Sequence, residues 1–124
     1  MPEKGNVLIL DDDDFVRETI CEVVEGFGYR IEAAKDGAAA LAAIRKEPPD
    51  ILITDIIMPG ISGLEVIAEI RKNFPEVKII AISGGGGAKG SDNLSEAAKL
   101  GSDWIIPKPI DIKELENVLK QLAG

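Results

Sequence analysis

The sequence VLILDDDD at residues 7–14 decides the fold, because four consecutive apolar residues are followed at once by four aspartates. An apolar run without polar alternation is typical of a strand that is buried on both faces of a parallel sheet. Beyond it, apolar residues recur at helical spacing over residues 16–27, where Gly26 and Gly28 mark the end of the helix. The stretch therefore predicts a buried strand that leads through an acidic junction into a helix.

The same unit, a short apolar run followed by an amphipathic segment, recurs along the rest of the chain. After the first strand and helix, we expect strands over residues 29–34, 51–54, 77–82 and 104–106, and helices over 37–46, 64–74, 92–100 and 115–122. This alternation predicts parallel strands joined by right-handed crossovers. The expected fold is a single α/β domain over residues 1–124, doubly wound as a three-layer sandwich around a five-stranded parallel sheet of order 2-1-3-4-5.

Composition narrows the possible functions. The chain of 124 residues has a formal net charge of −8, which argues against DNA, RNA or an anionic membrane as a direct partner. It has no histidine, which excludes histidine-based catalysis, and its single cysteine excludes an internal disulfide. No apolar run approaches the ~18 residues of a membrane span, and the first residues lack a signal-peptide pattern. We therefore expect a cytoplasmic location.

Polar residues stand where the expected strands end. Asp11 and Asp12 follow the first strand, Asp55 the third, Ser83 the fourth, and Lys108 comes shortly after the fifth. In an open α/β sheet the functional crevice lies beyond the carboxyl ends of the strands, and in the order 2-1-3-4-5 the first and third strands are neighbours. We therefore expect the three aspartates to lie together, with the serine and the lysine beside them.

This set of side chains suits phosphoryl transfer. Three carboxylates a few ångströms apart repel one another unless a cation intervenes, and a hard, oxygen-liganded ion such as Mg²⁺ fits them. Lys108 can pair with a phosphoryl group, Ser83 can donate a hydrogen bond to it, and a carboxylate can accept it covalently. Capping of the following helix is the simpler role expected for Asp13 and Asp14, but it does not explain Asp55.

The ordered motifs resemble those of the response-regulator receiver domain. VLILDD at residues 7–12 resembles that family's first strand and acidic pair, and DILITDIIMPGISG at 50–63 resembles its phosphoacceptor strand with the Met-Pro and Gly turn. IIAISG at 79–84 resembles its strand that ends in Thr or Ser, and IIPKP at 105–109 resembles its Lys-Pro signature. The similarity runs over nearly the whole chain and implies the flavodoxin-like fold that the strand pattern also predicts.

The resemblance assigns roles to the acidic residues. It implies that Asp55 is the phosphoacceptor, and that Mg²⁺ (or Mn²⁺) is held by Asp11, Asp12, Asp55 and the backbone carbonyl of Ile57. The implied donor is a phosphohistidine on a sensor histidine kinase or a phosphotransfer protein. The chain would then be no enzyme in the ordinary sense, because it would catalyse only its own phosphorylation and dephosphorylation.

The resemblance also implies a switch. Ser83 and Lys108 would bind the phosphoryl oxygens, the Lys108–Pro109 peptide bond would be cis, and the surface of the fourth helix, fifth strand and fifth helix would change for a downstream protein partner. The position of the family's aromatic switch residue is here Ile105, while Trp104 is expected on the other side of the strand. We expect a monomer or weak homodimer, and we expect no output domain after the last helix.

The sequence departs from the family pattern in two further places, one of which concerns loss of the phosphoryl group. Ile57 and Gly85 stand at positions that tune hydrolysis of the acyl phosphate, and the apolar Ile57 offers no group to position water, so we expect slow self-dephosphorylation. The glycine-rich loop over residues 84–90 is longer than is typical for the family, which suggests mobility or close backbone approach to a ligand.

Other functions remain open from the sequence. A nucleotide-binding P-loop at residues 84–91 fails because its lysine and second glycine are out of register. A flavin site is disfavoured because four aspartates would repel a phosphate. The pattern Asp12-x-Asp14-x-Val16 resembles the nucleophile motif of haloacid dehalogenase-type phosphatases, in which Asp12 would carry the phosphate and Asp55 would have no role. The last alternative is a degenerate receiver that acts as a constitutive binding module.

Overall fold

A computed structural model describes residues 5–56, 60–83 and 101–123. Its strands are β1 (Asn6–Leu10), β2 (Arg30–Ala34), β3 (Ile51–Asp55), β4 (Lys78–Ser83) and β5 (Trp104–Pro107). Its helices are α1 (Asp14–Gly26), α2 (Gly37–Lys46), α3 (Gly63–Asn73) and α5 (Ile112–Ala123). The helix expected over 92–100 and the glycine-rich loop over 84–90 lie outside the described residues.

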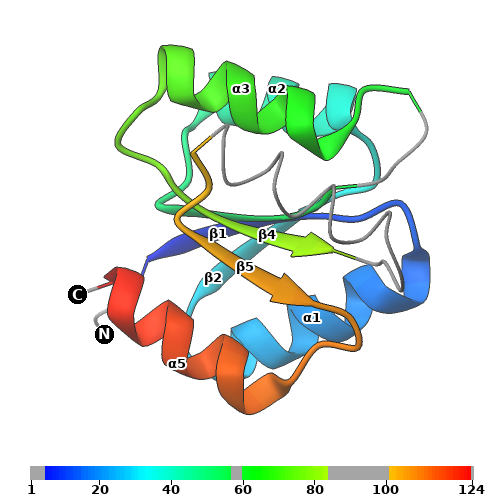
Figure 1. The fold of residues 1–124 in the computed structure, drawn as a ribbon, viewed down its shortest axis with the longest axis vertical. Coiled ribbons are helices and arrows are strands. Elements are labelled where there is room, and N and C mark those ends of the chain that lie inside the picture. The colour runs from blue at the N-terminus through cyan, green and yellow to red at the C-terminus, as the bar shows by residue number, and fades with distance from the viewer. Residues whose placement is uncertain (1–4, 57–59, 84–100, 124) are drawn as a thin grey trace.

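The five strands form one parallel sheet in the order β2-β1-β3-β4-β5, so the expected topology is confirmed. Figure 1 shows α2 and α3 on one face of this sheet and α1 and α5 on the other, which makes three layers. The order in which strands are added to the sheet reverses between the neighbours β1 and β3. The carboxyl ends of these two strands therefore lie side by side at one edge of the sheet. None of the helices in these ranges is long and apolar enough to cross a membrane.

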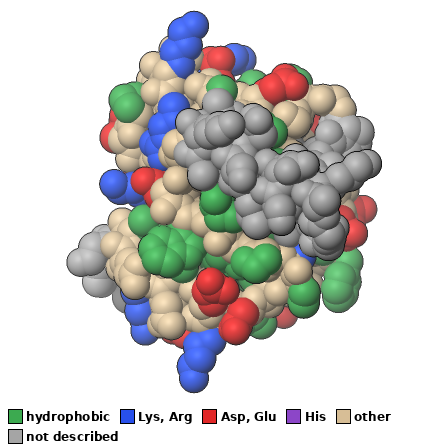
Figure 2. Space-filling model, in the orientation of Figure 1, with side chains coloured by type: hydrophobic (Ala, Val, Ile, Leu, Met, Phe, Trp, Pro, Cys, Tyr) green, Lys and Arg blue, Asp and Glu red, His purple; other side chains and the backbone are tan. Residues whose placement is uncertain are grey.

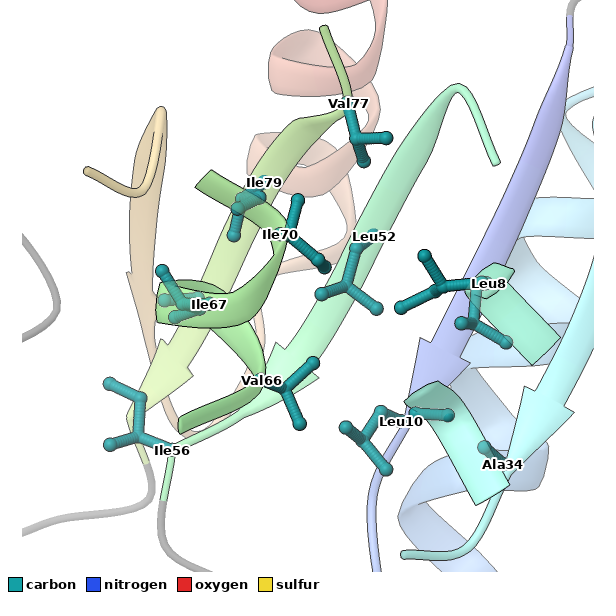
Figure 3. Close-up of a cluster of buried hydrophobic side chains, with 13 residues drawn as sticks. Leu8, Leu10, Ala34, Leu52, Ile56, Val66, Ile67, Ile70, Val77 and Ile79 are labelled. Carbon is teal, nitrogen blue, oxygen red and sulfur yellow. The ribbon is translucent and has the colours of Figure 1, made fainter. Parts of the chain in front are cut away.

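The core is divided by the sheet because alternate residues of each strand face opposite layers. Leu8, Leu52 and Ile79 pack toward α2 and α3. Figure 3 shows Leu52 and Ile79 beside the α3 side chains Val66, Ile67 and Ile70, with Leu8 on the other side of Leu52. Their neighbours along the strands pack toward α1 and α5; this second cluster includes Val7, Ile9, Ile51, Ile53, Ile80 and Leu115. Burial on both faces explains why the central strands are almost continuous Val, Ile and Leu.

Capping residues decide where the helices begin. Asp13, Asp36 and Ser62 are extended residues whose side chains accept hydrogen bonds from the first turns of α1, α2 and α3. The first helix consequently begins at Asp14, two residues before the apolar periodicity predicted. The capping role expected for Asp13 is confirmed, and Asp14 supplies a negative charge to the same first turn.

Candidate functional site

Two buried carboxylates define the candidate site, at the carboxyl ends of neighbouring strands. Asp11 follows β1 directly and is 1% exposed, and Asp55 ends β3 and is 5% exposed. Carboxylates are rarely buried in proteins unless they are paired or bind a metal. The expectation that the strand order would bring Asp11 and Asp55 together is therefore met, and their burial demands a positive partner.

Lys108 is that partner within the described residues. Its Nζ lies 3.4 Å from Oδ2 of Asp11 and 3.5 Å from Oδ2 of Asp55, so one cation bridges the two carboxylates. Burial on its own would lower the pKa of Lys108, but the charges of Asp55 and Asp11 and their hydrogen bonds outweigh it and raise the pKa above its ordinary value. Lys108 is therefore a permanent positive charge at neutral pH.

The loop after β5 brings Lys108 to this position. The Lys108–Pro109 peptide bond is cis, as the family resemblance implied. β5 pairs with β4 so that Ser83 lies opposite Pro107, and the lysine follows immediately. The backbone of Ser83 thus stands one residue from the site in the register of the sheet, while its side chain lies outside the described structure, and so do all atoms of Ile57.

Asp12 completes an acidic cluster at this edge of the sheet. One carboxylate oxygen from each of Asp11, Asp12 and Asp55 lies within 4.8 Å of the others. Asp12 is exposed, in contrast to its two partners, so the cluster opens to solvent on the side of the loop after β1. The predicted grouping of the three aspartates is therefore observed.

The donor set fits a hard divalent cation. Oδ1 of Asp11 accepts a hydrogen bond of 2.9 Å from the backbone N–H of Asp13, whereas Oδ2 is buried and has the ammonium of Lys108 beside it at 3.4 Å. A buried carboxylate oxygen with only one long ionic contact is costly, and Mg²⁺ and Mn²⁺ bind oxygens of this kind. The cluster offers three carboxylates as ligands, and that of Asp12 lies on its exposed side.

Arg17 is a component of this site that we did not predict from the sequence. Its Nη1 donates a 2.9 Å hydrogen bond to the carbonyl oxygen of Asp11, and its Nη2 pairs with the carboxylate of Asp14. The spacing of Asp14 and Arg17, three residues apart on a helix, is the one signal in the sequence that indicates part of this contact. The bond to Asp11 depends on how the strand meets the helix, which local spacing does not encode.

Gly63 fixes how closely α3 approaches the acceptor strand. A Cβ at this position would lie 1.9 Å from the carbonyl oxygen of Asp55, and the Gly63 N–H donates to the carbonyl of Ile56 at 3.1 Å. Only glycine permits this approach, since no other residue lacks a Cβ. The first turn of α3 therefore packs directly on the backbone that carries Asp55.

β5 carries the position at which the family places its aromatic switch. Ile105 is half-buried against the cluster beneath α2 and α3, whereas Ile106 belongs to the cluster beneath α1 and α5. Trp104 shares the side of Ile106 by strand alternation and is 39% exposed. The expectation that Trp104 and Ile105 face opposite sides is thus confirmed, and the switch role of Ile105 stays a prediction.

An apolar groove of about 300 Å³ borders the site between α1 and the start of α5. Two large hydrophobic side chains stand exposed on it, Phe15 at 78% and Ile112 at 51%. Lys108 forms part of its wall, so the groove is continuous with the acidic cluster. The rest of the lining is apolar apart from Thr19 and comes from Val16, Thr19, Ile20, Val23, Pro109, Ile110 and Leu115.

Comparison with known proteins assigns the family. The sequence matches the response regulator receiver domain over residues 7–120. "Response regulator MprA" from Mycobacterium ulcerans (strain Agy99) and from Mycobacterium tuberculosis (strain ATCC 25177 / H37Ra) are each 34% identical over 112 residues, or 88% of this chain and 46% of the relative. The chain thus spans about half the length of these curated relatives.

Solved structures agree with the sequence match. A response regulator receiver domain protein from Clostridium thermocellum superposes with a TM-score of 0.88 at 26% identity, covering 96% of this chain and 94% of the other. The receiver domain of NtrX from Brucella abortus superposes with a TM-score of 0.87 at 28% identity, covering 94% and 97%. The chain belongs to the response regulator receiver domain family, which acts in two-component signalling.

Proposed function

We propose that this chain is a phosphoryl-accepting switch in which Asp55 receives a phosphoryl group in a reaction that depends on Mg²⁺ or Mn²⁺. The observation that carries the proposal is the bridge from Lys108 to the buried carboxylates of Asp11 and Asp55, beside the exposed Asp12. Family membership supports a phosphohistidine on a sensor histidine kinase or phosphotransfer protein as the donor. Such a donor, together with the single cysteine, favours a cytoplasmic location.

The roles of the residues follow from charge and position. A carboxylate oxygen of Asp55 forms a bond to phosphorus while the P–N bond of the donor breaks, and the electron pair returns to the imidazole nitrogen. Lys108 lies 3.5 Å from Oδ2 of Asp55 and offsets the negative charge that arrives with the phosphoryl group. Asp11, Asp12 and Asp55 would hold the divalent cation, which neutralises phosphoryl oxygens when bound. The chain then acts on itself only and is not an enzyme with turnover on other substrates.

The apolar groove beside Lys108 supports docking of the phosphohistidine-bearing surface of the donor. Asp55 is too deeply buried to be reached without close contact at the edge of the sheet, and the groove is the apolar surface that adjoins this edge in the described structure. Phe15→Ala is therefore expected to slow transfer from the histidine kinase that phosphorylates the wild type fastest in a panel of purified kinases. An equal loss with acetyl phosphate as donor would contradict a docking role.

Phosphorylation is proposed to alter the surface of β5, α5 and the helix expected over residues 92–100 for a downstream protein. Ser83 ends β4 beside β5, and its hydroxyl is expected to close on the phosphoryl group. Ile105 is half-buried on β5 and takes the place of the aromatic switch residue. Figure 2 shows hydrophobic side chains at the surface on this side of the molecule, where β5 and α5 lie in Figure 1. The apolar Ile57 favours slow self-dephosphorylation.

The first test is intact-mass measurement after incubation with acetyl phosphate, with and without Mg²⁺, for the wild type and Asp55→Ala. We expect one added phosphoryl group on the wild type, only with Mg²⁺, and none on Asp55→Ala. Label on Asp55→Ala that is lost in Asp12→Ala would instead indicate phosphatase-like chemistry at Asp12. If no phosphoryl group is added to the wild type or to either variant, the chain would instead be a binding module that is not phosphorylated.

A further inference from the structure

The loop that joins β1 to α1 concentrates negative charge. It consists of Asp11, Asp12 and Asp13, and Asp14 follows as the first residue of α1; the first two belong to the acidic cluster. Like charges at this spacing repel one another, and the exposed Asp12 has no packing to hold it. The position of Asp12 is therefore set by the backbone on either side of it.

Arg17 contacts both ends of this run of aspartates, Asp11 and Asp14. Its Nη1 donates to the carbonyl oxygen of Asp11 at 2.9 Å, and its Nη2 pairs with the carboxylate of Asp14. The carbonyl of Asp11 belongs to the peptide group that joins Asp11 to Asp12, so the guanidinium holds the peptide from which Asp12 extends. The Arg17 side chain is 14% exposed, which keeps it in this orientation.

We propose that Arg17 is a positioning residue for divalent-cation binding, because it holds the Asp11–Asp12 peptide so that the Asp12 carboxylate stays within reach of Asp11 and Asp55. The inference rests on the proposed function, since it concerns the same site. The planar guanidinium makes both contacts at once in a fixed fork. The single ammonium of a lysine has no such fork and is a poor substitute.

The direction in which cation affinity changes when Arg17 is removed distinguishes a positioning role from a purely electrostatic one. If Arg17 acted only as a positive charge near the cluster, its removal would strengthen cation binding, because one repulsive charge would be lost. If it positions Asp12, its removal weakens cation binding. The helix cap on Asp13 and its bond to Asp11 do not involve Arg17, so α1 should still begin at the same place in the variants.

The experiment is a calorimetric titration of the whole chain with Mn²⁺ and with Mg²⁺, for the wild type, Arg17→Gln and Arg17→Lys. Arg45→Gln is the matched control, because it removes the same charge from the exposed end of α2. Loss of a partner that orients a metal ligand typically weakens metal affinity by 10–100-fold, and for this part-exposed contact we expect roughly tenfold in Arg17→Gln. Arg17→Lys should recover only part of that loss, and Arg45→Gln should match the wild type.

Circular dichroism at the titration temperature confirms that each variant is folded, and Arg17→Lys serves as the test if Arg17→Gln is not. Unchanged or tighter binding in both folded Arg17 variants overturns the inference and leaves the proposed function intact. If the wild type itself binds neither ion, the metal-dependent function fails together with the inference. As a second measurement, the Mg²⁺ concentration for half-maximal phosphorylation by acetyl phosphate should rise in Arg17→Gln, while the rate at saturating Mg²⁺ returns toward that of the wild type.

Discussion

At the scale of single residues, Lys108 has two opposing effects on the site. It bridges Asp11 and Asp55 and so occupies the position toward which a divalent cation would be drawn. Lys108→Met should therefore bind Mg²⁺ more tightly, because a competing positive charge is gone. The same variant should be phosphorylated by acetyl phosphate roughly 10²-fold more slowly, because the charge that offsets the phosphoryl group is also gone.

The two measurements are calorimetric Mg²⁺ titration and the rate of mass increase, and Lys120→Met is the matched control. Lys120 lies on the exposed side of α5 and pairs only with Glu116 among the contacts of the described structure. It should leave both quantities unchanged. Weaker Mg²⁺ binding in Lys108→Met would show that the lysine supports the cation site rather than competing with it.

Cys21 offers a pH-dependent test at the same scale. Burial in α1 raises the pKa of its thiol above the ordinary value of 9.0; the charge of Arg17 opposes this, and Glu25 and Glu18 reinforce it. Because only the thiolate reacts, a raised pKa means fewer reactive molecules at pH 8. We expect iodoacetamide to modify the folded chain more slowly than the denatured chain, with a rate that still climbs above pH 9. Equal rates in the two states would contradict this.

At the scale of elements, the approach of α3 to β3 depends on one missing Cβ. Gly63→Ala would place a methyl group 1.9 Å from the carbonyl oxygen of Asp55, so the helix or the acceptor strand must move. We expect the free energy of unfolding to fall by about 2–3 kcal/mol in urea, and phosphorylation of the folded variant to slow.

Gly26→Ala is the control for this prediction, since a Cβ there meets nothing within 4 Å at the end of α1. Its unfolding free energy should stay within about 1 kcal/mol of the wild type, on the stabilising side. A Gly63→Ala variant as stable and as active as Gly26→Ala would mean that the helix start adjusts without cost.

The helices and strands that local patterns encode were predictable, and so was the strand order. Individual side-chain hydrogen bonds between distant elements were not. The strand runs and their parallel order followed from apolar runs and turn residues, and the order then placed Asp11, Asp55 and Lys108 at one edge. Arg71 shows the limit: it lies in the last turn of α3 and donates to the carbonyl of Gly101 at 2.6 Å and to the carboxylate of Asp103. These partners lie 30 and 32 residues away, so no periodicity in the sequence connects them.

At the scale of the whole molecule, stability and cation binding are coupled through the acidic cluster. Folding brings three carboxylates within 4.8 Å in a chain of net charge −8, and an unfolded chain does not hold them together. A cation that binds only the folded state therefore stabilises it, by about 2.7 kcal/mol at a hundred times its dissociation constant. Mg²⁺ at that excess should raise the thermal midpoint of the wild type by roughly 5–15 °C.

Asp12→Asn should melt at a higher temperature than the wild type without Mg²⁺ and at a lower temperature with it. Without Mg²⁺ the variant should melt at a higher temperature, because one of three repelling charges is gone and Asp12 is exposed, so its loss leaves no cavity. With saturating Mg²⁺ it should melt at a lower temperature, because one ligand charge is missing. The measurement is scanning calorimetry, with NaCl at matched ionic strength to account for general screening of charges. The control variant is Glu32→Gln, which removes an exposed charge on β2, and Mg²⁺ should raise its thermal midpoint as much as that of the wild type. Parallel shifts in Asp12→Asn and the wild type would mean that Asp12 takes no part in the cation site and that Asp11 and Asp55 hold the ion by themselves.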